Sequence, residues 1–495
     1  MKSIKIFSIV LLLSAIVFSC KKDYLETRPS DAVTQEEILG TTDKISSTLD
    51  AAYKTFFAFS PGGGGGHDDY GQKSWDLSSD LMGTDMVVHT QGYGWYNASY
   101  QYTEWQVPTA NRHSDLAWFY YYNIIKQANT ILKVIDVANG PQTDKEKFKG
   151  EALGMRAYAY YFLINYNQQT YKGNENKPGV IIQLDPGDLE GKTRATVQQV
   201  YDQIIADLTQ AESLLTGKTR VDKVHIDVSV VRGLRARVAL LMEDWPTAAA
   251  KANLARQGYP LMSASTYPTR SAFSSIINSE WMWGSFIPSD QATIYASFFS
   301  HMDISTGGYA ALGSQKKITK ALYDQIAVGD VRKTVFTAPG TGTFANPDYN
   351  QLKFQVPVAN NWAADYVYMR SAEMYLIEAE ALARQSQDAL ARSVLETMVT
   401  ARYPAYSAAS FSGAALINEI SLQRRIELWG EGFSLIDIKR LKIGLNRPTG
   451  PGNHGSPNFD PSVYILPAGD PKFLMRIPQK ELDSNPALTP ADQNP

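Results

Sequence analysis

Hydrophobic residues recur at intervals of three to four positions through most of the chain, which is the period of an amphipathic helix. The clearest example is the segment 114–138, where apolar residues return regularly to one face. Thr196 is a suitable N-cap for another such segment, which ends at Leu215. Because successive segments are separated by short breaks, we expect antiparallel helix pairs that bury their apolar faces against the next pair. The pattern predicts helices over residues 35–59, 114–138, 144–166, 196–215, 228–242, 246–256, 369–384, 389–401 and 414–441.

Three regions lack this helical period: residues 61–113, 259–367 and 444–495. They are rich in Gly, Pro, Asn and aromatic residues, and the polyglycine run Gly62–Gly66 predicts a flexible loop. Long loops on a rigid scaffold are where binding residues usually lie. The predicted fold class is therefore mainly α, a scaffold of tetratricopeptide-like helical pairs with long irregular loop insertions and a few short strands.

Alternating aromatic residues indicate where some of these strands lie. Tyr100 and Tyr102 fall on one side of an extended chain, with Trp105 three residues further on, and Trp281 and Trp283 fall on one side of another. Aromatic side chains that share one face of a strand are more often core than ligand platforms. We therefore expect these five residues to pack inward.

The N-terminus has the layout of a secretory signal. Lys2 and Lys5 precede the apolar run Ile6–Phe18, which meets Ser19 and Cys20. The apolar run is shorter than the ~20 residues that a membrane-spanning helix needs. The chain has no second cysteine, so Cys20 cannot form an internal disulfide. Its position resembles the lipobox of a bacterial lipoprotein, in which the thiol is acylated; an ordinary signal peptide with an incidental cysteine is the alternative. We expect a signal peptide over residues 1–19, a lipidated tether over residues 20–34 and a body outside the bilayer.

The charge and the aromatic content narrow the class of partner. The formal net charge is −3, so the chain lacks the excess of basic residues that binding to nucleic acid or to an anionic lipid surface requires. Contact with a membrane is therefore expected through the lipid anchor only. The chain contains 28 Tyr, 19 Phe and 9 Trp, which favours recognition by ring stacking over recognition by charge.

Signatures of catalysis and of metal binding are weak. The six histidines have no short ligand spacing and Cys20 is used by the lipid, so we expect no zinc site. Asp76, Asp80 and Asp85 were weighed as ligands of a structural Ca²⁺, but they lack the spacing of a calcium loop, and solvated loop acids are favoured. No Gly-x-Ser-x-Gly elbow occurs. A pair of carboxylates for glycoside hydrolysis stays an alternative, because such pairs meet only in space.

The charged residues of the C-terminal helices have a structural interpretation. Arg370 and Arg424 can each bind a carboxylate through two N–H groups, as buried ion pairs often require. We therefore expect the acids and arginines around them to lock helices together. Gly430 and Gly432 are expected to end or bend the helix in which they lie.

Two aromatic patches in the loops are the candidate ligand site. Sugar rings present apolar C–H faces rimmed by hydroxyl groups, so they suit flat aromatic platforms with amides or carboxylates beside them. The first patch lies between Asp85 and Pro108, and the second lies in the central insertion near Gly307-Gly308. The predicted ligand-binding residues are Asp85, Gln91, Tyr93, Trp95, Tyr96 and Asn97 in the first patch, and Tyr295, Phe299, His301 and Tyr309 in the second.

Several motifs resemble those of the SusD/RagB family. These proteins are surface lipoproteins of Bacteroidetes-type bacteria that work with TonB-dependent transporters. The resemblance covers nearly the whole mature chain in order. It rests on Glu151–Phe162, Arg235–Trp245, Met369–Leu382, Arg424–Phe433 and the tail with Ile477–Glu481 and Asn485-Pro486.

The resemblance implies a single SusD-like domain over residues 35–495, with an N-terminal part 35–258, a loop-rich insertion 259–367 and a C-terminal part 368–495. It implies a lipid-anchored protein at the surface of the outer membrane that binds an oligosaccharide and delivers it to a SusC-like, TonB-dependent transporter. Neither catalysis nor a cofactor is implied. In the family, glycan platforms lie in loops at the two places found here; location carries over, but residue identity does not. Capture of peptides for the same kind of transporter and glycoside hydrolysis are the alternatives.

Overall fold

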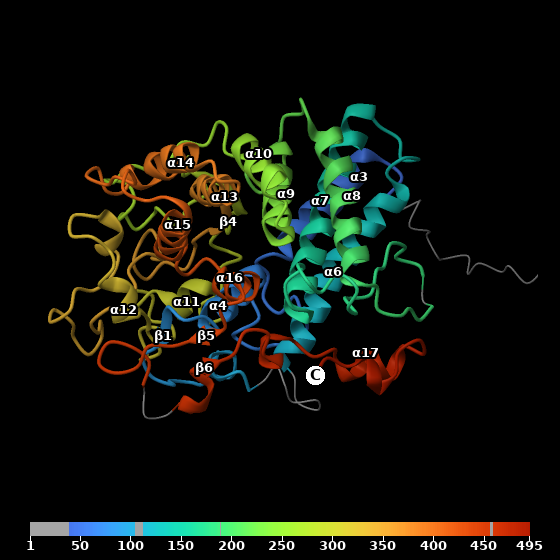
Figure 1. Ribbon diagram of the computed structural model, residues 1–495. Coiled ribbons are helices and arrows are strands. Elements are labelled where there is room, and N and C mark those ends of the chain that lie inside the picture. Colours follow the sequence, from blue (N-terminus) through green and yellow to red (C-terminus); the bar gives the residue numbers. More distant parts are fainter. Residues whose placement is uncertain (1–38, 104–111, 189, 456–458) are drawn as a thin grey trace, which may run out of the picture.

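The computed structural model of the chain describes residues 39–103, 112–188, 190–455 and 459–495 (Figure 1). The signal peptide, the tether with Cys20, the start of the first predicted helix and Trp105 lie outside the described residues. The fold is mainly α, as the hydrophobic period predicts. The scaffold helices are α3 (Thr42–Lys54), α6 (Arg112–Val134), α7 (Gln142–Asn167), α8 (Val197–Leu215), α9 (Val228–Met242), α10 (Trp245–Ala255), α13 (Ser371–Arg384), α14 (Asp388–Thr400), α15 (Gly413–Glu427) and α16 (Ser434–Leu441).

Successive helices pack on one another to form a continuous scaffold. In Figure 1, α6, α7 and α8 stand together on one side, α9 and α10 lie beside them, and α13, α14 and α15 complete the other side. Helix α10 contacts α13 although the central insertion separates them in sequence. Thr196 caps α8 in a reciprocal capping box with Gln199, as its position in the sequence predicts. The helical pairing is therefore confirmed.

One predicted helix is wrong in its extent. The segment 414–441 forms α15 and α16 in place of one continuous helix. Gly432 adopts φ +93°, and a Cβ there would lie 2.7 Å from the Cα of Asp76. Only glycine allows the backbone to turn and approach helix α4 (Gln72–Leu81) so closely. The predicted break at the glycines is confirmed.

A helix that the pattern did not predict lies at the centre of the molecule. Helix α4 (Gln72–Leu81) falls in a region expected to be non-helical, and all ten of its residues are buried. Seven of its ten residues are polar or charged, so the segment offers only three apolar positions from which a helical period could be read. Asp80 on this helix accepts hydrogen bonds from the backbone N–H groups of Gly432 (2.9 Å) and Ser434 (3.1 Å). Helix α4 therefore joins the N-terminal loops to the C-terminal helices.

The strands form three short antiparallel pairs. They are β1 (Met86–Val88) with β3 (Lys316–Ile318), β2 (Trp281–Ser285) with β4 (Tyr366–Arg370), and β5 (Leu445–Asn446) with β6 (Ile465–Leu466). Trp281 and Trp283 are buried in β2, as predicted. Tyr100 and Tyr102 are also buried, but they lie in and just after a short helix, so the predicted strand there is wrong. The remaining short elements are α5 (Asn97–Gln101), α11 (Phe298–Met302), α12 (Lys320–Tyr323), α17 (Gln479–Ser484), η2 (Val331–Lys333), η3 (Pro461–Val463), η4 (Pro471–Phe473) and η5 (Pro490–Asp492).

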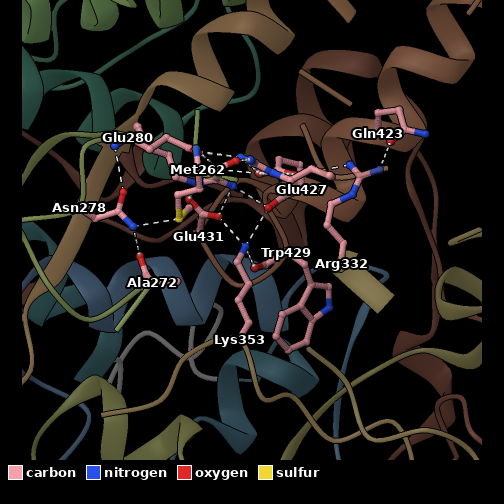
Figure 2. Close-up of polar contacts among 12 residues, drawn as sticks. Met262, Ala272, Asn278, Glu280, Arg332, Lys353, Gln423, Glu427, Trp429 and Glu431 are labelled. Carbon is pink, nitrogen blue, oxygen red and sulfur yellow. Dashed lines mark hydrogen bonds and ion pairs between the residues drawn. The ribbon is translucent and has the colours of Figure 1, made fainter. Parts of the chain in front are cut away.

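A buried ion network holds the insertion to the C-terminal helices (Figure 2). Arg370 binds both carboxylate oxygens of Glu431 (2.7 and 2.8 Å) and also donates to Glu280 and Glu427 at 2.6 Å. Arg402 reaches Glu280 (2.8 Å) and Glu427 (3.0 Å). Burial alone would raise the pKa of Glu427, but the surrounding arginines outweigh burial and hold its pKa well below the usual range. The predicted bidentate role of Arg370 is confirmed.

Candidate functional site

The two predicted aromatic patches meet around Tyr309. Ring centroids of Tyr93, Trp95 and Tyr295 lie 5.3, 6.0 and 5.5 Å from that of Tyr309. Tyr93 and Trp95 belong to the loop between β1 and α5, whereas Tyr295 and Tyr309 flank α11 in the central insertion. The antiparallel pairing of β1 with β3 brings these two loops to one side of the molecule. The fold thus joins residues that are about 200 positions apart in the sequence.

His67 completes this group. Its ring is near-parallel to those of Trp95 (5.4 Å, 28°) and Tyr295 (5.8 Å, 8°), and its Nδ1 lies 2.6 Å from the hydroxyl oxygen of Tyr309. We refer to Tyr93, Trp95, Tyr295, Tyr309 and His67 as the aromatic cluster. His67 was not among the predicted residues. It follows a run of glycines, and no motif in the sequence links it to Tyr295 and Tyr309, which lie more than 200 residues later.

The aromatic cluster has an exposed rim and a buried floor. Tyr93 is 67% exposed and Tyr295 43% exposed, while Trp95 and His67 are half-buried and Tyr309 is only 7% exposed. Phe59, which is 47% exposed, extends the rim, with its ring 6.5 Å from that of His67. Because these rings pack against one another, each keeps a fixed orientation while part of its surface stays accessible to solvent. Such a surface can receive the flat face of a ligand.

Three predicted contact residues lie beneath this surface. Tyr96, Phe299 and His301 are each at most 2% exposed, so their placement at the ligand is corrected. The hydroxyl of Tyr96 donates to Tyr70 at 2.6 Å, and the ring of His301 stacks under Tyr309 at 5.0 Å. Burial lowers the pKa of His301 to about 3, so the ring is neutral at ordinary pH. These residues support the floor from within the core.

Asp85 is also corrected as a ligand contact. Its carboxylate accepts two hydrogen bonds from Arg425, at 2.6 and 2.8 Å, and its backbone oxygen accepts one from the indole of Trp429 at 3.1 Å. Because both carboxylate oxygens of Asp85 are bonded to Arg425, this side chain stabilises the scaffold and does not face a ligand. The hypothesis of a structural Ca²⁺ needed Asp85 together with Asp76 and Asp80. Within the described ranges, no three histidine, cysteine or carboxylate side chains are arranged to hold a metal ion.

Two amides stand beside the cluster. Asn97 donates from its side chain to the backbone oxygen of Gln91 at 3.3 Å, and both residues are half-buried. Asn97 Oδ1 is a buried acceptor that has no hydrogen-bond partner among the residues described. The contact of Gln91 and Asn97 with a ligand stays a prediction.

Comparisons with known proteins identify the family. A family model described as "Starch-binding associating with outer membrane" matches residues 24–240, and the "SusD family" model matches residues 341–495. A SusD-like protein P2 of Formosa agariphila is 24% identical over 518 residues, which cover 96% of this chain and 98% of the relative. In the part of the chain described by the structure, no helix has both the length and the apolar character of a membrane span.

Solved structures agree with this result. A SusD-like carbohydrate binding protein from Bacteroides vulgatus superposes with a TM-score of 0.80 at 28% identity, covering 92% of this chain and 98% of that protein. A surface glycan-binding protein A from Bacteroides thetaiotaomicron, solved in complex with laminarihexaose, has the same fold, with a TM-score of 0.69 at 16% identity over 92% of this chain and 99% of its own. The family models match both the N-terminal and the C-terminal parts, and the fold extends between them. The chain therefore belongs to the SusD family.

Proposed function

We propose that this protein is a cell-surface lipoprotein that binds an oligosaccharide at the aromatic cluster without cleaving it. It delivers the bound sugar to a SusC-like, TonB-dependent transporter in the outer membrane. The observation that carries the proposal is the meeting of two loop patches in one partly exposed group of rings around Tyr309. Loops that converge on a rigid scaffold are a usual place for ligand recognition.

The chemistry of the aromatic cluster suits a sugar. The rings of Trp95 and Tyr295 can receive the C–H face of a pyranose, since both are accessible and held in place by His67. The amide of Asn97 provides an acceptor for a hydroxyl group. Each stacked ring adds about 1 kcal/mol beyond the area that it buries. A site with two or three such contacts binds modestly, which suits a protein that must release its ligand to a partner.

The relatives support a glycan as the class of ligand. One structural relative is a complex with laminarihexaose, and another is described as carbohydrate binding. The description of the N-terminal family model names both starch binding and association with the outer membrane. The partner transporter and the lipid on Cys20 rest on the lipobox-like N-terminus and on the family.

The proposal of binding without turnover rests on the carboxylates of Asp85, Glu427 and Glu431, which are held in ion pairs. Glycoside hydrolysis needs two carboxyl groups on either side of the scissile bond. Asp85, the carboxylate that the sequence placed in the first patch, is bound to Arg425. Glu427 and Glu431 are buried in the ion network with Arg370. Paired carboxylates of this kind stabilise the scaffold and are not free to transfer protons.

A binding survey tests the proposal. The mature protein, purified in a detergent without a sugar headgroup, is titrated by calorimetry with gluco-, xylo-, manno- and galacto-oligosaccharides and with mixed peptides. Each mixture is then analysed by chromatography for cleavage products. We expect heat from one class of oligosaccharide and an unchanged ligand. Binding of peptides alone would favour peptide capture, and released shorter sugars would favour a glycoside hydrolase.

A further inference from the structure

A second groove opens next to the aromatic cluster. It has a volume of about 950 Å³ and is formed by the C-terminal half of α3, the loop 221–225 and the segment 276–291. This volume lies at the upper end of the range of pockets that hold small organic ligands. The residues used in the argument below are Asp50, Phe57, Asp222, His225, Phe286 and Gln291.

Two short segments of the chain connect the groove to the aromatic cluster. Phe57 lines the groove and stands two residues before Phe59, which extends the rim of the cluster beside His67. On the other wall, Gln291 lines the groove and stands four residues before Tyr295. Because an extended chain advances at most about 3.6 Å per residue, the two pairs of Cα atoms lie within about 7 Å and about 14 Å of each other. A chain-like ligand can therefore pass from one site to the other.

The groove repeats the chemistry of the aromatic cluster. The ring of Phe286 is 56% exposed and that of Phe57 is half-buried, so both offer apolar faces to a ligand. Asp50 and Asp222 are exposed carboxylates on the same groove, and carboxylates accept hydrogen bonds from hydroxyl groups. Aromatic faces next to planar acceptors are the combination that a sugar requires.

Asp50 is held in position by buried groups. The Nε2 atom of His225 lies 3.3 Å from Asp50, and its Nδ1 atom lies 2.9 Å from the fully buried Glu151. Tyr53 donates to the same oxygen of Glu151 at 2.7 Å, and its ring packs against the imidazole at 4.8 Å. A ligand-facing group that is fixed by a layer of packed and hydrogen-bonded residues loses little freedom on binding.

We propose that this groove is a second subsite, which binds the continuation of an oligosaccharide whose other part is stacked on the aromatic cluster. The inference rests on the proposed function and adds to it a preference for long chains. Short oligosaccharides occupy the aromatic cluster alone, whereas longer ones also cover Phe286 and reach Asp50 and Asp222. The groove thus sets the length of glycan that the protein selects.

The test is a chain-length series. The mature protein in detergent is titrated with β-1,3-gluco-oligosaccharides from disaccharide to octasaccharide, and with matched α-glucan, xylan, mannan and galactan series. For a series that binds, we expect affinity to rise again once the chain exceeds the length that covers the aromatic cluster. Phe286→Ala should weaken the long members about fivefold and leave the short members unchanged, because one stacked ring is lost. Asp222→Asn should weaken the long members in the same way.

Two controls separate the possible failures. Phe344→Ala removes a 97% exposed ring from another loop and should leave every affinity unchanged. Trp95→Ala should weaken short and long members alike. If Phe286→Ala and Asp222→Asn both bind the long chains as the parent does, the second subsite is wrong and the proposed function stands. If no series binds, the proposed function itself is wrong and the subsite is lost with it.

Discussion

The Nδ1 atom of His67 lies 2.6 Å from the hydroxyl oxygen of Tyr309, and this hydrogen bond joins the glycine-rich loop after α3 to the segment that follows α11. The backbone oxygen of His67 lies 2.8 Å from Nε2 of His301, which holds the same loop from below. The rim and the floor of the aromatic cluster are therefore coupled through one histidine. Its glycine neighbours alone would leave that loop free to move.

This coupling predicts the effect of removing one hydroxyl group. Tyr309→Phe keeps the ring and its stacking contacts but deletes the hydrogen bonds of the hydroxyl with His67 and with Trp95. We expect about a threefold to tenfold weaker oligosaccharide binding, because the loop must then be ordered when the ligand binds. Calorimetry checks this, and the melting temperature should change little, since one hydrogen bond contributes about 1 kcal/mol. Unchanged affinity would mean that His67 is ordered without Tyr309.

Trp95 is the residue whose loss should weaken binding most directly. Trp95→Ala removes a half-buried ring that contacts both His67 and Tyr309. We expect a loss of about 1–2 kcal/mol of binding free energy, or roughly a fivefold to thirtyfold higher Kd. Phe344→Ala is the matched control, because its ring is 97% exposed and belongs to a different loop. Equal affinities of the two variants would place the ligand elsewhere.

The buried ion network should be essential to stability. Arg370 is 1% exposed and binds Glu280, Glu427 and Glu431. Arg370→Met leaves these carboxylates short of counter-charge in the core, which costs about 3–5 kcal/mol. The midpoint of urea unfolding should fall accordingly.

A surface pair provides the control for this change. Lys149 lies 2.7 Å from Asp136, whose side chain is 67% exposed. Lys149→Met should lower the free energy of unfolding by less than about 1 kcal/mol, because water screens such pairs. If both variants unfold at the same urea concentration, the network contributes no more than an exposed pair does.

Gly71 should tolerate no side chain. It precedes α4 with φ +84°, and a Cβ there would lie 2.1 Å from the backbone oxygen of Phe56. Gly63 has nearly the same φ (+83°) but no atom within 4 Å of such a Cβ. Gly63→Ala should cost about 1 kcal/mol, the price of the conformation alone, and Gly71→Ala clearly more. Thermal unfolding of the two variants measures the difference; similar melting temperatures would contradict the predicted clash.

His225 should make stability depend on pH. It packs between Glu151 on α7 and Asp50 and Tyr53 on α3, with Asp222 in its own loop. Burial alone would lower the pKa of His225, but the hydrogen bond and the charge of Glu151 outweigh burial and raise it. The protonated form is therefore favoured by folding. The resulting stability is complete below the unfolded pKa of about 6.5 and is lost as the pH rises through the folded value.

Thermal unfolding of the parent and of His225→Gln between about pH 6 and about pH 9 checks this dependence. The parent should lose part of its advantage over the variant as the pH rises. Other titrating groups act on both proteins, so the difference between the two curves isolates the histidine. A constant difference across this range would show that His225 does not change its charge there.

The scaffold could be predicted from the sequence because most of its helices have one buried and one exposed face. Helices α6–α10 and α13–α14 were predicted within a few residues because their apolar residues recur at helical spacing. Helix α4 was missed because only Trp75, Leu77 and Leu81 of its ten residues are apolar, too few to show a helical period. The division between α15 and α16 was placed at the right glycines, but its effect on the helix was underestimated.

The candidate site was predictable in its location but less so in its residues. Clusters of Tyr and Trp in loops indicated both patches, and the fold brings them together. The direction of each side chain could not be read from the sequence: Trp95 is only half-buried, whereas its neighbour Tyr96 adopts φ +66° and is fully buried. His67 could not be predicted for another reason: its hydrogen bond with Tyr309 joins residues that are more than 200 positions apart in the sequence.

The network around Arg370 also has a consequence for how the chain assembles. Its cations come from the middle of the sequence, whereas two of its acids, Glu427 and Glu431, arrive near the end. Until those acids are present, Arg370 and Arg402 share the single carboxylate of Glu280, so enclosing both would strand positive charge. We therefore expect that a polypeptide truncated before Glu427 does not fold stably and is degraded by proteases. Partly folded forms of the protein should not accumulate.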